Sequence, residues 1–141
     1  MVAISDSLTW QLVGQNNSFM KKRNGRSSRT GAVRFSSEPG NVASLSTFKF
    51  SGIANSKATD FKVGTDAKGN TFPVMLKKTA KGGLKEIPLN KNFRGAVKTI
   101  NSQNQRADLS SVVKAKYDGI YKANMVKKSL KKKTVIKAGR N

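Results

Sequence analysis

The side chains that offer chemistry in this sequence are lysines and arginines, and they gather in three stretches. The chain has 28 Lys and Arg residues against 7 Asp and Glu residues, which gives a formal net charge of +21. Folding does not require such an excess of positive charge, and repulsion between like charges opposes a compact state. A polyanion would supply the missing negative charge, and nucleic acid is favoured because each neutralised phosphate releases counterions. The predicted chemistry is therefore phosphate binding.

We expect three basic surfaces to contact nucleic-acid phosphates. The hairpin surface consists of Lys21, Lys22, Arg23, Arg26, Arg29 and Arg34. The loop surface consists of Lys77, Lys78, Lys81 and Lys85. The tail surface consists of Lys127, Lys128, Lys131, Lys132 and Lys133. Residues 1–20 contain no Lys or Arg, so we expect neutral segments to form the core and basic segments to surround it.

The acidic residues form no recognisable catalytic or metal-binding motif. None of them makes a close pair such as Asp-x-Asp, and Asp66 and Asp108 already have expected roles in a turn and a helix cap. The chain has no His and no Cys, which removes the commonest general base, the commonest metal ligand and any thiolate. The glycine pairs and loops do not match the GxxxxGK[ST] phosphate loop. We therefore expect no enzyme activity, no metal, no cofactor and no small-molecule substrate.

The same sequence offers no signal for a membrane or for export. No apolar run approaches the ~18 residues that a membrane span needs. Residues 1–15 lack the basic start and long apolar centre of a signal peptide, so we expect a cytosolic or nuclear protein.

A short helix and a β-hairpin are predicted at the start of the chain. Ser5 or Ser7 is a suitable N-cap for a helix over residues 8–13. Its Trp10 is the only tryptophan, and we expect it to pack in the core. A strand starting at residue 19 and a returning strand over 31–36 flank an Asn-Gly turn signal. Phe35 is expected to face inward on the returning strand.

Further strands are predicted between residues 42 and 89. Residues 42–50 alternate apolar and polar side chains, which predicts a strand with Phe48 and Phe50 on one face. Core packing is the favoured role for these two rings, and stacking of nucleic-acid bases is the alternative. Residues 58–63 and 71–78 predict a clear hairpin in which Phe61 and Val63 share a face, and residues 84–89 a short strand. The first 90 residues therefore predict a small antiparallel sheet of about five or six strands after the short helix.

The apolar period changes from two to about 3.6 after residue 90, which predicts two C-terminal helices. The first carries Phe93, Val97 and Ile100 and ends near residues 102–104. The second begins at Asp108, which we expect to act as its cap. Its apolar stripe contains Leu109, Val112, Val113, Tyr117, Ile120 and Tyr121, with the tyrosine hydroxyls at the edge of the core. We expect an α+β fold: a single domain over residues 7–126 and a basic C-terminal extension over 127–141.

Four segments also resemble a known family in their order and spacing. They read SLTWQLV (7–13), NNSFMKK (16–22), FSSEPGN (35–41) and TFKFSGIANSK (47–57). They are similar to the eukaryote-specific large-subunit ribosomal protein family numbered twenty-eight. Arg106-Ala107-Asp108-Leu109 resembles that family's Tyr-Arg-Pro-Asp-Leu element, with Ala107 in place of Pro and Gln105 in place of Tyr.

The resemblance implies a structural constituent of the large subunit of the cytosolic ribosome. Its partners would be ribosomal RNA and neighbouring ribosomal proteins, and its assembly would begin in the nucleolus. Two other hypotheses compete with this one. A DNA-packaging or chromatin protein would carry similar charge, but the order of elements offers no helix-turn-helix or other DNA-reading element. A basic ribonuclease is disfavoured by the lack of histidine.

Overall fold

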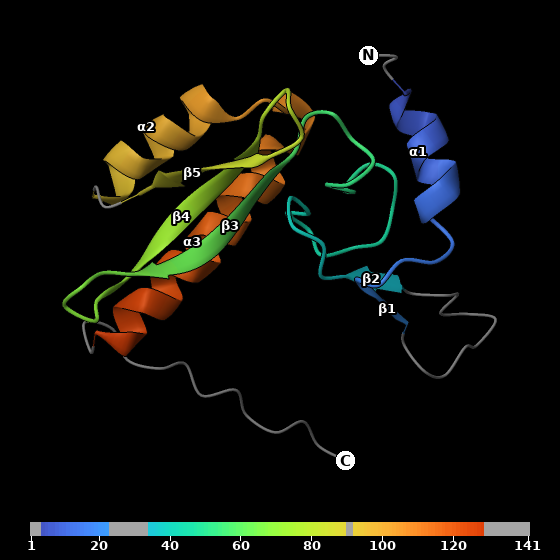
Figure 1. Cartoon of the computed structure of the whole chain (residues 1–141). Coiled ribbons are helices and arrows are strands. Elements are labelled where there is room, and N and C mark those ends of the chain that lie inside the picture. The colour runs from blue at the N-terminus through green and yellow to red at the C-terminus, as the bar shows by residue number, and fades with distance from the viewer. Residues whose placement is uncertain (1–3, 23–33, 90–91, 129–141) are drawn as a thin grey trace, which may run out of the picture.

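The computed structural model describes residues 4–22, 34–89 and 92–128, and within them the predicted α+β fold is confirmed (Figure 1). No helix in these ranges is long and apolar enough to span a bilayer. In chain order the elements are α1 (Asp6–Val13), β1 (Met20–Lys22), β2 (Arg34–Ser36), β3 (Thr59–Thr65), β4 (Thr71–Lys78), β5 (Leu84–Pro88), α2 (Phe93–Gln103), the 3₁₀ helix η1 (Ala107–Leu109) and α3 (Ser110–Lys127).

The strands divide between two antiparallel sheets, whereas the sequence predicted a single one. β1 and β2 form a two-stranded ribbon in which Lys22 is opposite Arg34. β3, β4 and β5 form a three-stranded sheet with β4 in the centre. The predicted β3–β4 hairpin is confirmed, and its turn is stabilised by Asp66, whose carboxylate accepts a hydrogen bond from the Ala67 N–H at 2.9 Å. Gly69 supplies the positive φ of 78° that the same turn requires.

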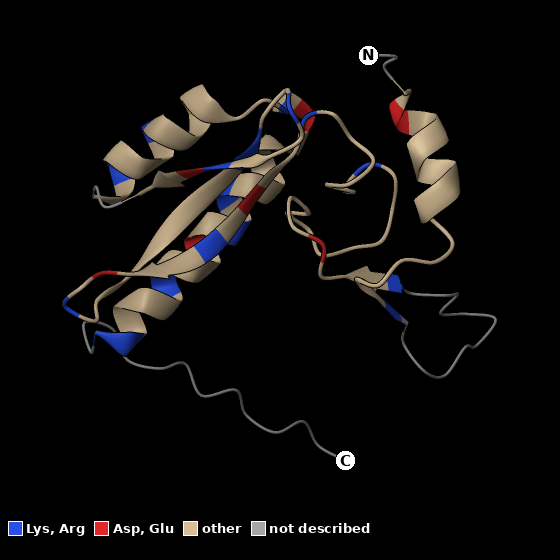
Figure 2. Ribbon diagram, viewed as in Figure 1, with Lys and Arg blue, Asp and Glu red and all other residues tan. Residues whose placement is uncertain are grey.

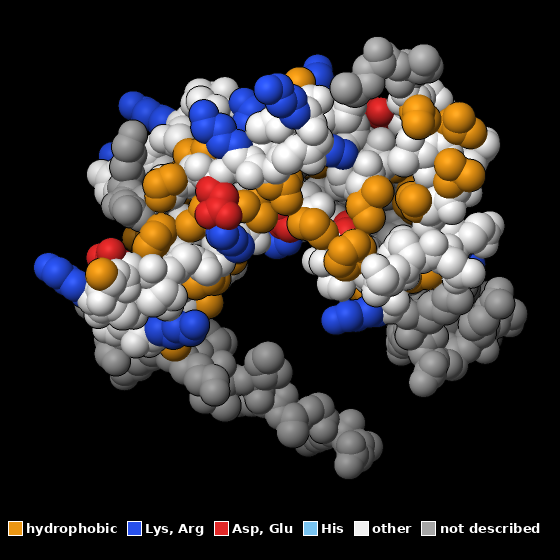
Figure 3. Space-filling model, in the orientation of Figure 1, with side chains coloured by type: hydrophobic (Ala, Val, Ile, Leu, Met, Phe, Trp, Pro, Cys, Tyr) orange, Lys and Arg blue, Asp and Glu red, His pale blue; other side chains and the backbone are white. Residues whose placement is uncertain are grey.

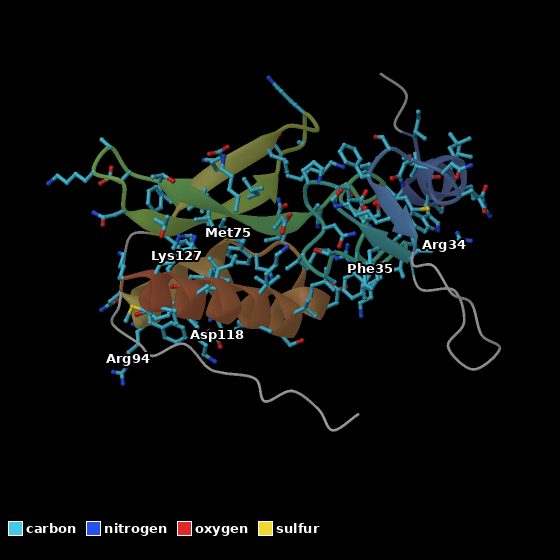
Figure 4. All side chains as sticks on the ribbon, turned by 90° about the horizontal axis from the view of Figure 1, so that it is seen from below. Arg34, Phe35, Met75, Arg94, Asp118 and Lys127 are labelled. Carbon is cyan, nitrogen blue, oxygen red and sulfur yellow. The ribbon has the colours of Figure 1, made fainter. Side chains whose placement is uncertain are left out.

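The hydrophobic core lies between the three-stranded sheet and the two C-terminal helices. Figure 4 shows these as two layers, with α3 running beneath the strands. Met75 of the central strand is fully buried there, and the predicted apolar stripe of α3 is confirmed as the face that packs on it. The Tyr117 hydroxyl is buried, so its predicted place at the edge of the core is wrong. The buried core residues are Val42, Phe61, Met75, Leu89, Ala96, Ile100, Leu109, Val113 and Tyr117.

α1 forms as predicted but lies outside this core. The Ser5 hydroxyl accepts a hydrogen bond from the Leu8 N–H at 3.3 Å, and Gly14 is the C-cap. None of the side chains of α1 is buried, so the expectation that Trp10 packs in the core is wrong. The indole lies instead against Phe48, with 6.1 Å between the ring centroids.

The predicted strand over residues 42–50 is wrong, because turns replace it. The Asn41 side-chain amide donates to the Glu38 carboxylate at 2.9 Å and to the Leu45 carbonyl at 2.8 Å. These bonds stabilise a turn that competes with an extended ladder. Ser44 has a positive φ of 56°, which also ends any extended run.

Two apolar side chains that the sequence placed inward are exposed, Phe35 by 42% and Phe48 by 40%. Val63, predicted on the same strand face as Phe61, is 47% exposed. β2 has three residues and no helix packs over Phe35 among the described residues, so its predicted inward orientation is wrong. Phe61 is buried, and Phe50 packs partly against the core. Phe48 and Phe50 therefore have different environments, since no strand holds them on one face.

α3 begins after η1, two residues later than predicted. Its N-cap position is Leu109, which offers no side-chain hydrogen bond. The Asp108 carboxylate binds the Arg106 guanidinium through two contacts of 2.8 and 2.9 Å. The prediction that Asp108 caps the helix is wrong, because a bidentate charged pair is stronger than a single N–H contact.

Candidate nucleic-acid interface

The described lysines and arginines fall into two classes, according to whether another part of the fold accepts their hydrogen bonds. Figure 2 shows that basic residues lie on every element of the larger sheet and on both C-terminal helices. Those with internal partners connect elements to one another. Those without such partners stand at the surface, where their charge is available to a ligand.

Lys78 belongs to the first class. Its ammonium group donates to three backbone carbonyls, of Gly52 at 2.8 Å, Ile53 at 3.0 Å and Asn55 at 2.7 Å. Burial lowers the pKa of Lys78, and the negative charges of Asp6 and Glu38 oppose that shift. Lys78 therefore ties the end of β4 to the turn at residues 52–55, and all three ammonium protons have acceptors inside the protein.

Two further ion pairs join elements that are distant in sequence. The Lys116 ammonium of α3 lies 2.6 Å from the Asp60 carboxylate of β3. Lys62 of β3 pairs with Glu86 of β5 across the outer face of the sheet, where both side chains are about half exposed.

Arg106 links η1 to the turn that precedes β3. Besides the pair with Asp108, its guanidinium donates to the Lys49 carbonyl at 3.1 Å. The hydrogen bond to Asp108 raises the pKa of Arg106, and the hydrogen bond from Arg106 lowers the pKa of Asp108. The opposite charges of Arg106 and Asp108 neutralise each other at the surface, so the pair contributes little to the external field.

The described part of the hairpin surface is exposed. Lys21 and Arg34 are both on the surface and have no acceptor among the described residues. The strand register sets position 22 opposite Arg34, so two basic positions face each other across the ribbon. Like charges at such opposed positions destabilise a sheet unless an anion is present. Arg23, Arg26 and Arg29 of this surface lie outside the described residues.

The loop surface divides between the two classes. Lys81 and Lys85 are exposed, whereas Lys78 points into its ring of carbonyls. Lys77 is half-buried and donates to Gln103 at 3.3 Å. Its cross-strand partner is Lys85, so this pair also sets two like charges side by side.

The tail surface starts at the end of α3, where Lys127 and Lys128 are exposed. Cations near a helix C-terminus interact favourably with its free carbonyl groups. Lys131, Lys132 and Lys133 lie outside the described residues.

Sequence reasoning missed a fourth group of exposed basic side chains on the C-terminal helices. Arg94 and Lys98 are four residues apart on α2, so they share one face, while Lys114 and Lys122 stand on α3. Their positions off the apolar stripes of the two helices were the sequence signal that could have placed them at the surface. Figure 3 shows blue side chains spread around the rim of the larger sheet and its helices, and hydrophobic ones gathered over α1.

This arrangement suits a long, irregular polyanion better than a small ligand. The basic groups without internal partners are spread over several faces and do not converge on one cavity. Among the described residues, no group of three or more Asp or Glu side chains could hold a metal ion. Phosphates along an RNA chain match such a distribution, because each cation can neutralise one of them.

Comparison with known proteins adds a family and two relatives. The family model described as the ribosomal L28e protein family matches residues 8–123. A protein of Schizosaccharomyces pombe named large ribosomal subunit protein eL28 is 29% identical over 137 residues, which covers 92% of this chain and 99% of that protein. A protein of the same name from Caenorhabditis elegans is 36% identical over 66 residues, 47% of each chain.

Proposed function

The chain belongs to the ribosomal L28e family, whose relatives are named as large ribosomal subunit proteins, and from that membership we propose that it binds ribosomal RNA through its exposed basic side chains. In this role it is a structural constituent of the large subunit of the cytosolic ribosome. Its remaining partners are neighbouring ribosomal proteins, and its assembly into the subunit begins in the nucleolus.

The observation that carries the proposal is the separation of the basic residues into two classes. Lys62, Lys78, Arg106 and Lys116 have acceptors within the fold. The exposed residues of the second class have none among the described residues, although each of them adds to the repulsion within the chain. An external polyanion removes that repulsion, and its counterions are released on binding.

The proposed contacts hold RNA by shape and charge and involve no catalytic step. Lysine and arginine side chains reach phosphates and 2′-hydroxyls, which are accessible along an RNA helix whatever its sequence. The contact set consists of Lys21, Lys22, Arg23, Arg26, Arg29, Arg34, Lys81, Lys85, Arg94, Lys98, Lys114, Lys122, Lys127, Lys128, Lys131, Lys132 and Lys133. Lys77 is left out because it is half-buried and donates a hydrogen bond to Gln103. Lys78 is left out of this set because three carbonyls surround its ammonium group.

The family match over residues 8–123 also supports the division of the chain that we propose. Residues 7–126 form one α+β domain that docks on the RNA, and residues 127–141 form a basic extension from it. The extension carries the Lys-rich end of the tail surface, which has few apolar residues with which to fold by itself.

Sedimentation tests the proposal directly. A tagged chain expressed in a eukaryotic cell should move with large subunits and whole ribosomes through a sucrose gradient, and should leave them only at high salt. Recovery with chromatin and not with ribosomes would favour the DNA-packaging alternative and overturn the proposal.

The tail surface has a separate test in vitro. Replacing Lys131, Lys132 and Lys133 with Ala should reduce the slope of log K against log salt for a structured RNA by roughly 2–3, about one for each lost phosphate contact. The matched control is Lys62→Ala, which removes a lysine whose ammonium is paired with Glu86. An unchanged slope in the triple variant would exclude the tail surface from the interface.

A further inference from the structure

A cavity of about 310 Å³ lies between the last turn of α1 and β2. Its lining is unusual for this chain, because it combines the only tryptophan with three polar side chains. Figure 4 shows Arg34 beside α1, at the edge of this region. The residues that line the cavity are Trp10, Gln11, Gly14, Gln15 and Arg34.

The Trp10 indole packs against Phe48 and Gly14 and remains partly exposed at the cavity. Phe48 packs against it at an interplanar angle of 40°. A Cβ at Gly14 would come within 2.9 Å of the indole carbon Cε2, so the ring lies directly on the glycine. The indole N–H has no acceptor among the described residues. The ring therefore offers a fixed stacking surface with an unused donor at its edge.

The polar groups around this ring are also without internal partners in the described part of the chain. Gln11 and Gln15 are exposed, and each amide presents both a donor and an acceptor. Arg34 supplies a planar guanidinium suited to phosphate. A flat aromatic platform, two amides and one cation together match the three parts of a nucleotide: a base face, a base edge and a phosphate.

The distribution of charge around the cavity favours one orientation of a bound nucleotide. Residues 4–20 contain no Lys or Arg, so Arg34 is the single cation that lines the cavity among the described residues. The C-terminal end of α1 presents carbonyl groups, which repel phosphate and accept hydrogen bonds from base amino groups. A phosphate is therefore favoured only beside Arg34, and the base toward Trp10. A hydrophobic side chain of a neighbouring protein would leave the two amides and the guanidinium unpaired.

We infer that this cavity binds an unpaired nucleotide of the RNA, with its base stacked on Trp10, its edge against Gln11 and Gln15, and its phosphate on Arg34. The inference rests on the proposed RNA-binding function and adds a site for a single-stranded element to it. Bases in a duplex are stacked on their neighbours and cannot reach the ring, so the site distinguishes unpaired from paired RNA.

Tryptophan fluorescence tests the site alone, because Trp10 is the only tryptophan. The full chain is titrated with two labelled hairpins of equal length, one fully paired and one with a single-stranded loop and bulge. Anisotropy of the label measures binding, and emission from Trp10 measures stacking. We expect both RNAs to bind, and only the RNA with unpaired nucleotides to quench the emission and to bind about tenfold more tightly.

Variants separate stacking from general attraction. Trp10→Ala should abolish the preference for unpaired RNA, and Trp10→Phe should keep most of it. Arg34→Ala should lower the salt slope by about one. Leu12→Ala is the matched control, since Leu12 is on α1, does not line the cavity and is 73% exposed. α1 contributes no buried side chain, so none of these changes removes part of the core.

Two results would overturn the inference and leave the proposed RNA-binding function standing. Saturating binding of the unpaired RNA without a change in Trp10 emission would show that the base does not stack there. A preference for unpaired RNA that survives in Trp10→Ala would assign the preference to another part of the chain. If neither RNA binds at physiological salt, the proposed function fails together with the site.

Discussion

The Lys116 ammonium of α3 lies 2.6 Å from the Asp60 carboxylate at the edge strand of the sheet. The side chain of Asp60 is 12% exposed and that of Lys116 is 26% exposed, so water screens this pair only in part. Asp60 also accepts the N–H of Phe61, which fixes the carboxylate next to the core. The contact therefore fastens the helix layer to the sheet by charge as well as by apolar packing.

Replacing Lys116 with Met should lower the free energy of unfolding by about 2–3 kcal/mol, because it leaves a largely buried carboxylate unpaired. Urea denaturation monitored by circular dichroism would measure the change. The control is Lys114→Met on the exposed side of α3, which should alter stability by less than about 0.5 kcal/mol. A double-mutant cycle with Asp60→Asn should give a coupling free energy well above that control, and a coupling near zero would contradict this role for the pair.

Lys78 and Lys81 are three residues apart and should behave in opposite ways. Lys78→Met should cost about 2–3 kcal/mol of stability, because three carbonyls lose a charged donor, while the affinity of the folded protein for RNA should hardly change. Lys81→Met should leave stability unchanged and reduce the salt slope of RNA binding by about one. Parallel denaturation and binding titrations measure both effects, and a reduced slope for Lys78→Met would return that residue to the RNA interface.

Gly52 stands where two backbone segments touch. A Cβ at this position would lie 2.3 Å from the Pro39 carbonyl oxygen and within 2.8 Å of two Gly40 backbone atoms. Gly52→Ala should therefore destabilise the protein by roughly 1–3 kcal/mol, because the backbone must move apart. Gly83→Ala is the control: its nearest atom would be the Thr79 hydroxyl at 3.6 Å, so thermal unfolding should shift little. Equal melting temperatures for the two variants would refute the close approach.

Tyr117 should make the folding stability of the protein fall at alkaline pH. Burial raises the pKa of Tyr117 to about 12 from its ordinary value of 10.0, with smaller effects from the charges of Tyr121 and Asp118. Above pH 10 the unfolded chain loses this proton while the folded chain keeps it, so stability falls as the pH rises toward 12. At pH 11 the loss should be about 1 kcal/mol relative to pH 8.

Tyr117→Phe should remove that loss and, at neutral pH, should stabilise the protein by about 1 kcal/mol. The hydroxyl is buried and has no hydrogen-bond partner among the described residues, so its removal relieves an unsatisfied polar group. Urea denaturation at pH 8 and pH 11, in parallel for both proteins, measures the two effects. An identical pH dependence in wild type and variant would assign the alkaline change to other groups.

Periodic segments with local turn chemistry were predictable from the sequence. The β3–β4 hairpin, α2 and the stripe of α3 follow from apolar spacing and from the Asp66–Asn70 turn, both of which act over a few residues. The turns after residue 41 could not be predicted. There the Asn41 side chain makes hydrogen bonds in place of those of a strand, and the alternation of apolar and polar residues gives no sign of this. The separate roles of Lys78 and Lys81 could not be predicted either, since they depend on which backbone carbonyls the tertiary fold places beside each ammonium group.

None of the nine buried core residues precedes Val42, and α1, β1 and β2 contribute none of them. Polar contacts that join this first part to the rest include the two hydrogen bonds that Ser56 donates to the Asp6 carboxylate of α1, at 3.0 and 3.1 Å. In hydrogen exchange, we therefore expect the amides of α1 and the β1–β2 ribbon to open at lower free energy than those of β4 and α3, as a separate cooperative unit. If the chain binds RNA as we propose, we expect its larger part to be rigid before assembly and its N-terminal part to gain protection from exchange only after RNA binds.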